Sequence, residues 1–261
     1  VKSIPDYSVE GKGSEDSFLN VKNELLYAIE LIAANKDMPY AVFKPSGMAP
    51  FSVLEKVSDG IELNTEEETS FEGIRDRWNA VFEYGAAKNV PVLVDAEESW
   101  IQKAIDDILM EFSLKYNKET PIVWNTFQMY RHDRLELLRE QIEFAREKGI
   151  KLGYKFVRGA YWEKENKYAE TNNLKSAVYQ KKEETDTAYN EAMLLCFENR
   201  DNVHFMNASH NEDSNYYLAD LMLKNKIDPS DKRVWFAQLL GMSNHITFNL
   251  AEAGFNVAKY V

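Results

Sequence analysis

The run from Lys155 to Trp162, with the sequence KFVRGAYW, combines residue types that could bind a nucleotide-bearing cofactor. Arg158 is a candidate phosphate ligand, because a guanidinium can hold a phosphate through two parallel hydrogen bonds. Gly159 would let the backbone approach a ligand closely, and Trp162 offers an aromatic face for stacking. The alternative interpretation is a surface loop with a salt-bridged arginine and a half-buried tryptophan.

Lys155 carries a charge inside the apolar run from Leu152 to Val157. A buried charge without a partner would cost several kcal/mol or more. We therefore expect this ammonium to face a partner or a ligand.

Polar side chains also follow several other apolar runs of the chain. They are Lys44, Asp95, Gln128, Ser209, His210, Asn211 and Tyr260. Each could instead be a solvated strand end, a loop residue or a helix cap. Because the active site of a (β/α) barrel lies at the carboxyl ends of its strands, their recurrence after many strands indicates one shared site.

The elements that must position these residues alternate between short β-rich runs and longer amphipathic runs. We expect eight strands, at Ile4–Val9, Tyr40–Lys44, Val90–Asp95, Pro121–Phe127, Lys151–Val157, Val203–Ala208, Val234–Gln238 and Asn256–Tyr260. Seven helices are expected between them: from Ser17 to Ala34, from Phe71 to Lys88, from a capping box at Ser99, from Arg134 to Glu147, over 175–199, from a cap at Asp213 or Ser214 to Lys224, and from Ser243 to Gly254. Residues 51–70 are expected to form a short helix and a loop.

Strands that are apolar nearly throughout are typical of a parallel sheet covered by helices on its faces. Eight βα units in 261 residues favour an α/β fold with a closed (β/α)8, TIM-like barrel, whose usual length is about 250 residues. An open doubly wound sheet is the alternative. We expect a single domain over residues 1–261, with the eighth helix missing from the given chain.

Composition excludes several classes of function. The formal net charge of −12 gives no basic footprint for nucleic acid. No apolar run reaches the length of a membrane span, and we see no secretory signal. Cys196 is the single cysteine, which fits a reducing compartment and a buried helix residue. The chain has no dinucleotide or Walker fingerprint, no nucleophile elbow and no metal-binding histidine or cysteine pair, so we expect no metal.

The run from Lys155 to Trp162 resembles the fifth-strand signature of the proline dehydrogenase family. Seven further segments resemble the family's motifs in the same order: Asp6–Gly11, Phe43–Lys44, Val94–Glu97, Phe127–Tyr130, Ser209–Asn211, Leu239–Met242 and Asn256–Val261. The resemblance covers nearly the whole chain. It implies a distorted (β/α)8 barrel that holds FAD and oxidises L-proline to Δ1-pyrroline-5-carboxylate by hydride transfer to the flavin, as part of proline catabolism.

The resemblance also implies partners and a location. Electrons would pass from the flavin to a membrane quinone, which requires peripheral contact with a membrane surface. The expected location is the cytoplasm, at the inner membrane, or the mitochondrial matrix in a eukaryote.

At the substrate, the resemblance assigns roles to four residues. Lys44 matches a lysine that binds the proline carboxylate. Asp95 matches the active-site aspartate, and Tyr260 matches the tyrosine that pairs with it. Lys155 matches a basic residue beside the hydride-accepting nitrogen of the flavin.

Along the cofactor, the implied contacts follow the length of FAD. The flavin ring would contact Ala96 and Gln128, and the pyrophosphate would contact Arg158, Gly159 and Ala160. The remaining implied contacts are Trp162, near the adenine, and Ser209 and His210.

The chain departs from the family pattern at several positions. Lys155 stands where many bacterial members carry arginine, Phe156 replaces leucine, and Ser209 replaces threonine. The family's eighth helix, with a Tyr-Leu-x-Arg-Arg motif that clamps the proline carboxylate, is expected after Val261. The sequence as given should therefore hold flavin but bind proline poorly.

Three other functions stay open at this point. The barrel could be a hydroxyproline dehydrogenase, or a non-catalytic fragment without a tightly bound cofactor. A third alternative is an aldolase-like lyase that uses Lys44 or Lys155 as a Schiff-base amine.

Overall fold

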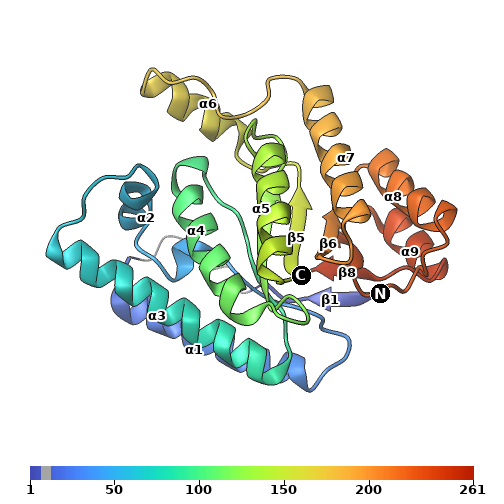
Figure 1. The fold of residues 1–261 in the computed structure, drawn as a ribbon, viewed down its shortest axis with the longest axis horizontal. Helices are drawn as coiled ribbons and strands as arrows, with labels where there is room; N and C mark the ends of the chain where they lie inside the picture. The colour runs from blue at the N-terminus through green and yellow to red at the C-terminus, as the bar shows by residue number, and fades with distance from the viewer. Residues whose placement is uncertain (7–12) are drawn as a thin grey trace. The chain divides into compact units, whose positions relative to one another are not determined.

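The computed structural model describes residues 1–6 and 13–261 and divides them into two compact units. One unit joins Val1–Ile4 to Thr126–Val261, and the other belongs to Pro5–Asn125. Figure 1 shows the ribbon with its element labels. Each unit is described by itself.

The strands form one eight-stranded parallel sheet within the described residues, in the order β1-β8-β7-β6-β5-β4-β3-β2. Strand β4 (Val123–Gln128) begins in the unit Pro5–Asn125 and ends in the other. Eight parallel strands alternating with helices make this fold a (β/α)8, TIM-like barrel, as predicted.

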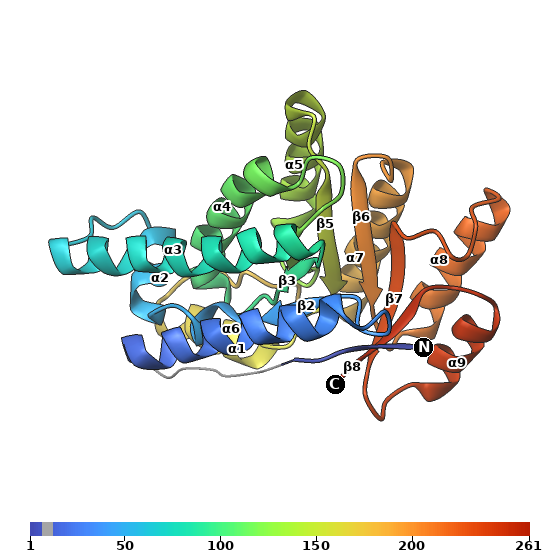
Figure 2. The same cartoon turned by 90° about the horizontal axis from the view of Figure 1, so that it is seen from below.

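The unit Pro5–Asn125 contains β2 (Ala41–Phe43), β3 (Val92–Val94) and the start of β4. Its helices are α1 (Glu15–Ala33), the one-turn helix η1 (Pro45–Gly47), α2 (Phe51–Ser58), α3 (Thr65–Lys88) and α4 (Ser99–Tyr116). Figure 2 shows α1 and α3 running alongside each other. Their apolar stripes pack on the strands around the fully buried Trp78 and Phe82.

Two helix starts in this unit differ from the prediction. Helix α3 begins at Thr65, six residues before the predicted Phe71, after a capping box between Asn64 and Glu67. The acidic first turn looks irregular in sequence, but carboxylates stabilise the amino end of a helix. In α4, Ser99 is the first helical residue and Glu98 occupies the cap position, so the predicted capping box is wrong.

The larger unit contains the remaining strands and helices. Its strands are β1 (Lys2–Ile4), the end of β4, β5 (Leu152–Val157), β6 (Val203–Ala208), β7 (Val234–Leu239) and β8 (Val257–Tyr260). Its helices are α5 (Arg134–Lys148), α6 (Trp162–Thr171), α7 (Lys182–Glu198), α8 (Glu212–Lys224) and α9 (Asn244–Glu252). Cys196 is buried in α7, as predicted, and burial raises the pKa of its thiol.

Strand β1 was predicted at Ile4–Val9 but spans Lys2–Ile4. It pairs with β8 through the register Ile4↔Tyr260, and it ends before Pro5, which has no N–H to donate to a ladder. The rest of the predicted strand, from Tyr7 on, and most of the family-like segment Asp6–Gly11 lie outside the described residues.

The predicted helix over 175–199 begins only at Lys182, and α6, which was not predicted, precedes it. The segment between them is extended, with an antiparallel bridge between Val178 and Arg131 and a bond from the N–H of Tyr179 to the carbonyl of Tyr130. Tertiary pairing with the loop after β4 therefore overrides the helical pattern.

Two predicted caps also differ. Asn211 caps α8, because its side chain accepts the N–H of Ser214, so the predicted caps Asp213 and Ser214 are wrong. Ser243 does occupy the cap position of α9, in a left-handed conformation, but its hydroxyl makes no cap bond and contacts His210 instead.

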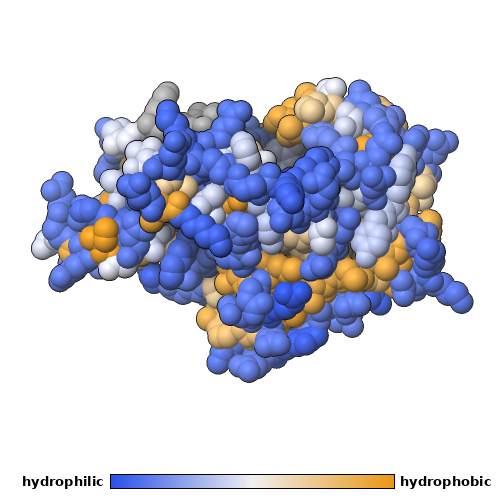
Figure 3. Space-filling view, turned by 90° about the horizontal axis from the view of Figure 1, so that it is seen from above, coloured by the Kyte–Doolittle hydropathy of each residue, from blue (hydrophilic) through white to orange (hydrophobic). Residues whose placement is uncertain are grey.

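On the face drawn in Figure 3, hydrophilic residues predominate and apolar residues form patches between them. None of the helices in the described part of the chain is both long and apolar enough to cross a membrane.

Candidate active site

In the unit Pro5–Asn125, the two predicted substrate-site residues follow neighbouring strands. Lys44 comes directly after β2, and Asp95 comes directly after β3. The strands are paired in the register Phe43↔Val94, and the N–H of Asp95 donates to the carbonyl oxygen of Phe43 at 3.0 Å. The two residues therefore leave the same edge of the sheet side by side, and Ala96 follows on the same turn.

A buried carboxylate that the sequence prediction gave no role fixes this edge. Glu97 accepts the backbone N–H of Ser46 at 2.8 Å and its hydroxyl at 2.6 Å. The turn after β2 is thereby bound to the turn after β3. The motif Val94–Glu97 contained this residue, but only the fold places it opposite Ser46, 51 positions away.

In the larger unit, Lys155 is buried, with 5% of its surface exposed, and its Nζ donates to the hydroxyl of Tyr260 at 3.0 Å. Its Nζ also lies 4.4 Å from the centre of the Tyr260 ring. Two strands separate β5 from β8 in the sheet, so this contact crosses the inner face. The prediction that Lys155 faces a partner is confirmed.

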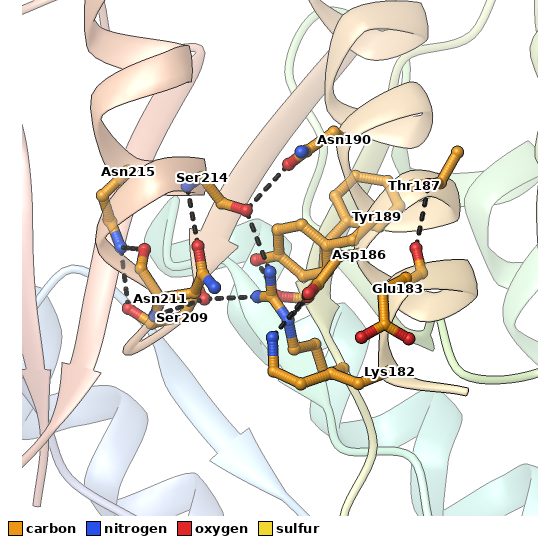
Figure 4. A network of polar contacts seen from close by, with 12 residues as sticks. Lys182, Glu183, Asp186, Thr187, Tyr189, Asn190, Ser209, Asn211, Ser214 and Asn215 are labelled. Atoms are coloured by element: carbon orange, nitrogen blue, oxygen red, sulfur yellow. Dashed lines mark hydrogen bonds and ion pairs between the residues drawn. The ribbon is translucent and has the colours of Figure 1, made fainter. Parts of the chain in front are cut away.

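Arg158, just after β5, is the centre of a polar cluster, part of which Figure 4 shows. Its Nε donates to Asp186 at 2.7 Å, Nη1 to Ser209 at 2.6 Å and Nη2 to Ser214 at 2.9 Å. The guanidinium carbon lies 4.4 Å from the ring centre of Tyr189. The side chain is thus fixed in a plane before any ligand binds.

Asp186 is the counter-ion of this cluster. One of its carboxylate oxygens accepts a hydrogen bond from Arg158. The other accepts one from Lys182, which lies one helical turn earlier on α7. Burial alone would raise the pKa of the Asp186 carboxyl, but these two cations hold it below its usual value. One carboxylate against two cations leaves the cluster with net positive charge, which suits an anionic ligand.

Gly159 adopts φ +138°, a backbone conformation that other residues rarely reach. A Cβ at this position would lie 2.4 Å from the ring of Tyr130. Tyr130 therefore fills the space on the side of the backbone where a Cβ would point. The next residue, Ala160, donates its N–H to the side-chain oxygen of Gln128 at 3.2 Å, which joins two of the predicted cofactor residues.

Trp162 opens α6 and is 45% exposed, so its indole face is available for stacking. Its Nε1 donates to the carbonyl oxygen of Tyr179 at 2.9 Å. The extended segment before α7 therefore fixes the orientation of the indole.

Ser209 and His210 follow β6. The buried Ser209 hydroxyl accepts from Arg158 and from the backbone N–H of Asn211. His210 Nδ1 lies 3.0 Å from the Ser243 hydroxyl. Burial and the nearby Lys259 ammonium lower the pKa of His210, which favours the neutral ring at pH 7.

These residue types fit a diphosphate-bearing aromatic cofactor. The larger unit brings together a fixed guanidinium and two serine hydroxyls. It also contains an exposed indole and holds a buried ammonium on the inner face of its strands. Sequence reasoning missed Asp186, Ser214 and Tyr189 as partners of Arg158. No group of acidic, histidine or cysteine side chains in the described ranges could hold a metal ion.

Comparison with known proteins places this chain in a family. The family model described as "Proline dehydrogenase" matches residues 1–261. The chain is 31% identical to the carbapenem antibiotics biosynthesis protein CarD of Pectobacterium carotovorum, over all of this chain and 67% of that protein. It is 29% identical to the mitochondrial proline dehydrogenase 1 of Dictyostelium discoideum, over all of this chain and 53% of that protein.

Solved structures show the same fold. Proline utilization A from Bdellovibrio bacteriovorus, inactivated by N-propargylglycine, superposes with a TM-score of 0.85 at 21% identity, over 99% of this chain and 28% of that one. The protein from Bradyrhizobium japonicum gives a TM-score of 0.84 at 19% identity, over 100% and 26%. The chain thus spans about a quarter of these relatives and about half to two thirds of the two curated proteins above.

Proposed function

Because this chain belongs to the proline dehydrogenase family, we propose that it oxidises L-proline to Δ1-pyrroline-5-carboxylate with FAD as the hydride acceptor. The observation that supports this most is the buried Lys155 ammonium on the inner face of the strands, held against Tyr260. A fixed cation in such a place stabilises negative charge that develops next to it.

FAD, when bound, would supply the two-electron acceptor. Arg158, with its orientation fixed by Asp186 and the two serines, would hold the diphosphate, and Gly159 and Ala160 would line the same segment. Trp162 would stack near the adenine, and Ser209 and His210 would make further contacts. Gln128 and Ala96 would contact the flavin ring.

On the substrate, Lys44 would bind the proline carboxylate. The amine must be unprotonated, so that the nitrogen lone pair stabilises the positive charge that develops as hydride leaves the ring carbon. Tyr260 accepts a hydrogen bond from Lys155, which leaves its own hydroxyl proton for another acceptor. We propose that Asp95 and Tyr260 shape and polarise the pocket.

We also propose a membrane quinone as the final electron acceptor, reached by peripheral contact with a membrane. Several relatives are named as mitochondrial proteins. This protein would act in the mitochondrial matrix of a eukaryote, or in the cytoplasm of a bacterium beside the inner membrane.

The first test is the visible spectrum of the purified protein after incubation with FAD, recorded without oxygen before and after adding L-proline. We expect flavin bands that bleach at high proline concentration. Flavin bands that persist at high proline concentration would overturn the proposal that L-proline is the substrate. If no FAD binds at all, the function itself is overturned.

The Bdellovibrio relative, which is inactivated by N-propargylglycine, suggests a second test. We expect the same compound to cause time-dependent loss of proline oxidation here, with protection by excess proline. Activity that survives prolonged incubation would show that the reacting groups are arranged differently.

The identity of the substrate has one competing interpretation. The relative named for carbapenem biosynthesis is about as similar to this chain as the proline dehydrogenases are. Sequence similarity therefore does not single out proline, and hydroxyproline, the substrate of the alternative left open by the sequence, is the second candidate. Flavin reduction rates measured side by side with proline and hydroxyproline would separate the two.

A further inference from the structure

Five buried polar side chains lie in contact with one another beside the turn from Ser209 to Asn211. We call them the polar relay: Tyr189 on α7, Asn207 on β6, Asn215 on α8, Gln238 on β7 and Thr247 on α9. Each exposes at most 2% of its surface. No family-like motif predicted a role for these five residues.

Asn207 and Asn215 form the centre of the relay. Asn207 Oδ1 lies 2.6 Å from the Tyr189 hydroxyl, and its Nδ2 donates to Asn215 Oδ1 at 3.2 Å. The Nδ2 of Asn215 then donates to the carbonyl oxygens of Ser209, at 3.0 Å, and Asn211, at 2.8 Å. The Asn215 side chain therefore holds both ends of the turn (Figure 4).

Gln238 holds the turn from the next strand. Its Nε2 donates to the same Ser209 carbonyl at 3.2 Å and lies 3.4 Å from Asn215 Oδ1. Its Oε1 accepts the hydroxyl of Thr247 at 2.8 Å, which fixes which way the amide faces. The Ser209 carbonyl thus receives two amide donors.

Beyond Thr247, the contacts return to the turn. The Thr247 hydroxyl lies 3.2 Å from the carbonyl oxygen of Ser243, and the Ser243 hydroxyl contacts His210. Both residues of the turn that are proposed to contact the cofactor, Ser209 and His210, are therefore supported by the relay.

Folding alone gives little reason for these groups. A buried hydrogen bond between neutral groups adds only about 1 kcal/mol of net stability, and replacing both partners with apolar groups of similar shape can be nearly neutral. Two relay residues, Asn215 and Gln238, donate to the turn whose Ser209 hydroxyl accepts from Arg158. Fixing that carbonyl fixes the position of the hydroxyl on the same residue.

We propose that the polar relay is a positioning device for FAD binding, which holds Ser209 and His210, and through Ser209 the Arg158 guanidinium, in the geometry that receives the cofactor. This inference rests on the proposed function. The relay residues act through the turn, and Tyr189 also acts through its ring beside Arg158. They do not themselves touch the cofactor.

The test is FAD affinity measured beside apoprotein stability. The double variant Asn207→Val/Asn215→Val removes both central amides and leaves no unpaired donor between them. We expect its FAD dissociation constant to rise roughly tenfold, within the range of coupling through a shared network, while its apoprotein melts within a few degrees of wild type. Gln238→Met, which keeps the length of the side chain, should weaken FAD binding by a smaller factor and serves if the double variant does not fold.

Asn199 provides the matched control. It is a buried asparagine of the same unit, it donates to the carbonyl oxygen of Leu195, and it lies at the carboxyl end of α7 before β6 begins. Asn199→Val should lower the melting temperature and leave FAD affinity unchanged.

Relay variants that bind FAD as wild type does would overturn the inference. It is equally overturned if affinity falls only in proportion to melting temperature, in the relay variants and in Asn199→Val alike. A wild-type protein that binds no FAD is a different result, because it overturns the proposed function.

Discussion

In the unit Pro5–Asn125, the buried amide of Asn117 holds the start of a strand, whereas in the larger unit the relay amides lie around the end of one. Asn117 is fully buried and accepts the N–H groups of Ile122 and Val123, which starts β4. The larger unit places Asn207, Asn215 and Gln238 around the turn after β6. We infer that Asn117 serves the architecture of its unit, whereas the relay amides serve ligand geometry.

A buried carboxylate of the smaller unit also lies at a strand end. Glu97 binds the turn at Ser46, beside the proposed substrate residues Lys44 and Asp95. In both units, a buried polar side chain holds the backbone next to proposed site residues at a strand end. Variants of the two groups should therefore fail in different assays.

The largest expected effect is at Arg158. Arg158→Met removes a guanidinium that makes three hydrogen bonds. It also removes the cation proposed to hold the diphosphate. A charged hydrogen bond is worth about 1.5–3 kcal/mol, so losing one such bond to the diphosphate should lower FAD affinity roughly a hundredfold. Titration of the apoprotein with FAD, followed by flavin fluorescence, measures this. An unchanged affinity would contradict the proposal that Arg158 binds the diphosphate.

Asn117→Ala should show the opposite pattern. It leaves two backbone N–H groups and the carbonyl of Val123 without their side-chain partner. Unfolding free energy should fall by about 2–3 kcal/mol, measured by urea denaturation. Affinity for FAD in the folded fraction should stay at the wild-type value, and a loss there would contradict the comparison.

His204, on β6 in the larger unit, tests a half-buried group with no proposed role in binding. Burial, helped by the Arg233 guanidinium, lowers its pKa to about 4. When the pH falls below about 6.5, the ordinary pKa of histidine, His204 is protonated in the unfolded chain but stays neutral in the folded one. The free energy of unfolding therefore decreases as the pH drops toward 4. At pH 5 the loss should be about 2 kcal/mol.

The variant His204→Gln isolates this effect. Its urea midpoint should change less between pH 7 and pH 5 than that of wild type, and FAD affinity at pH 7 should be the same in both. Equal pH profiles for the two proteins would show that the histidine is solvated in the fold.

The smallest effect is expected at Asp133. Burial would raise the pKa of its carboxyl, but hydrogen bonds from Arg134 and Arg131 lower it to about 2. The carboxylate therefore adds stability above pH 4, and this is lost as the pH falls toward 2. Because the side chain is 49% exposed, solvent screens the pairs, and Asp133→Asn should cost only about 1 kcal/mol at pH 7. A larger loss in thermal melts would mean that the two arginines depend on this anion.

Much of the fold follows from the sequence, because parallel strands buried on both faces leave a strong apolar signal. Strands β5 and β6 lie within one residue of their predicted bounds. The prediction fails where tertiary contacts decide, as for the extended segment before α7, and where acidic residues open a helix, as in α3.

The site follows from the sequence only in part. Lys155 and Arg158 stand out because a charge in or after an apolar strand needs a partner. Their partners cannot be found in the same way, because Asp186 and Ser214 lie 28 and 56 positions from Arg158 in helices with no distinguishing pattern. Side-chain partners on different helices become visible only when the fold brings them together.

Gly159 has a consequence for how this chain can vary. Replacing Tyr130 with a smaller residue would clear the space that a Cβ at position 159 needs, but the φ of +138° would still oppose every L-amino acid there. Two independent barriers protect one position. In a genetic screen, a defect caused by Gly159→Ala should therefore have no single second-site suppressor at position 130.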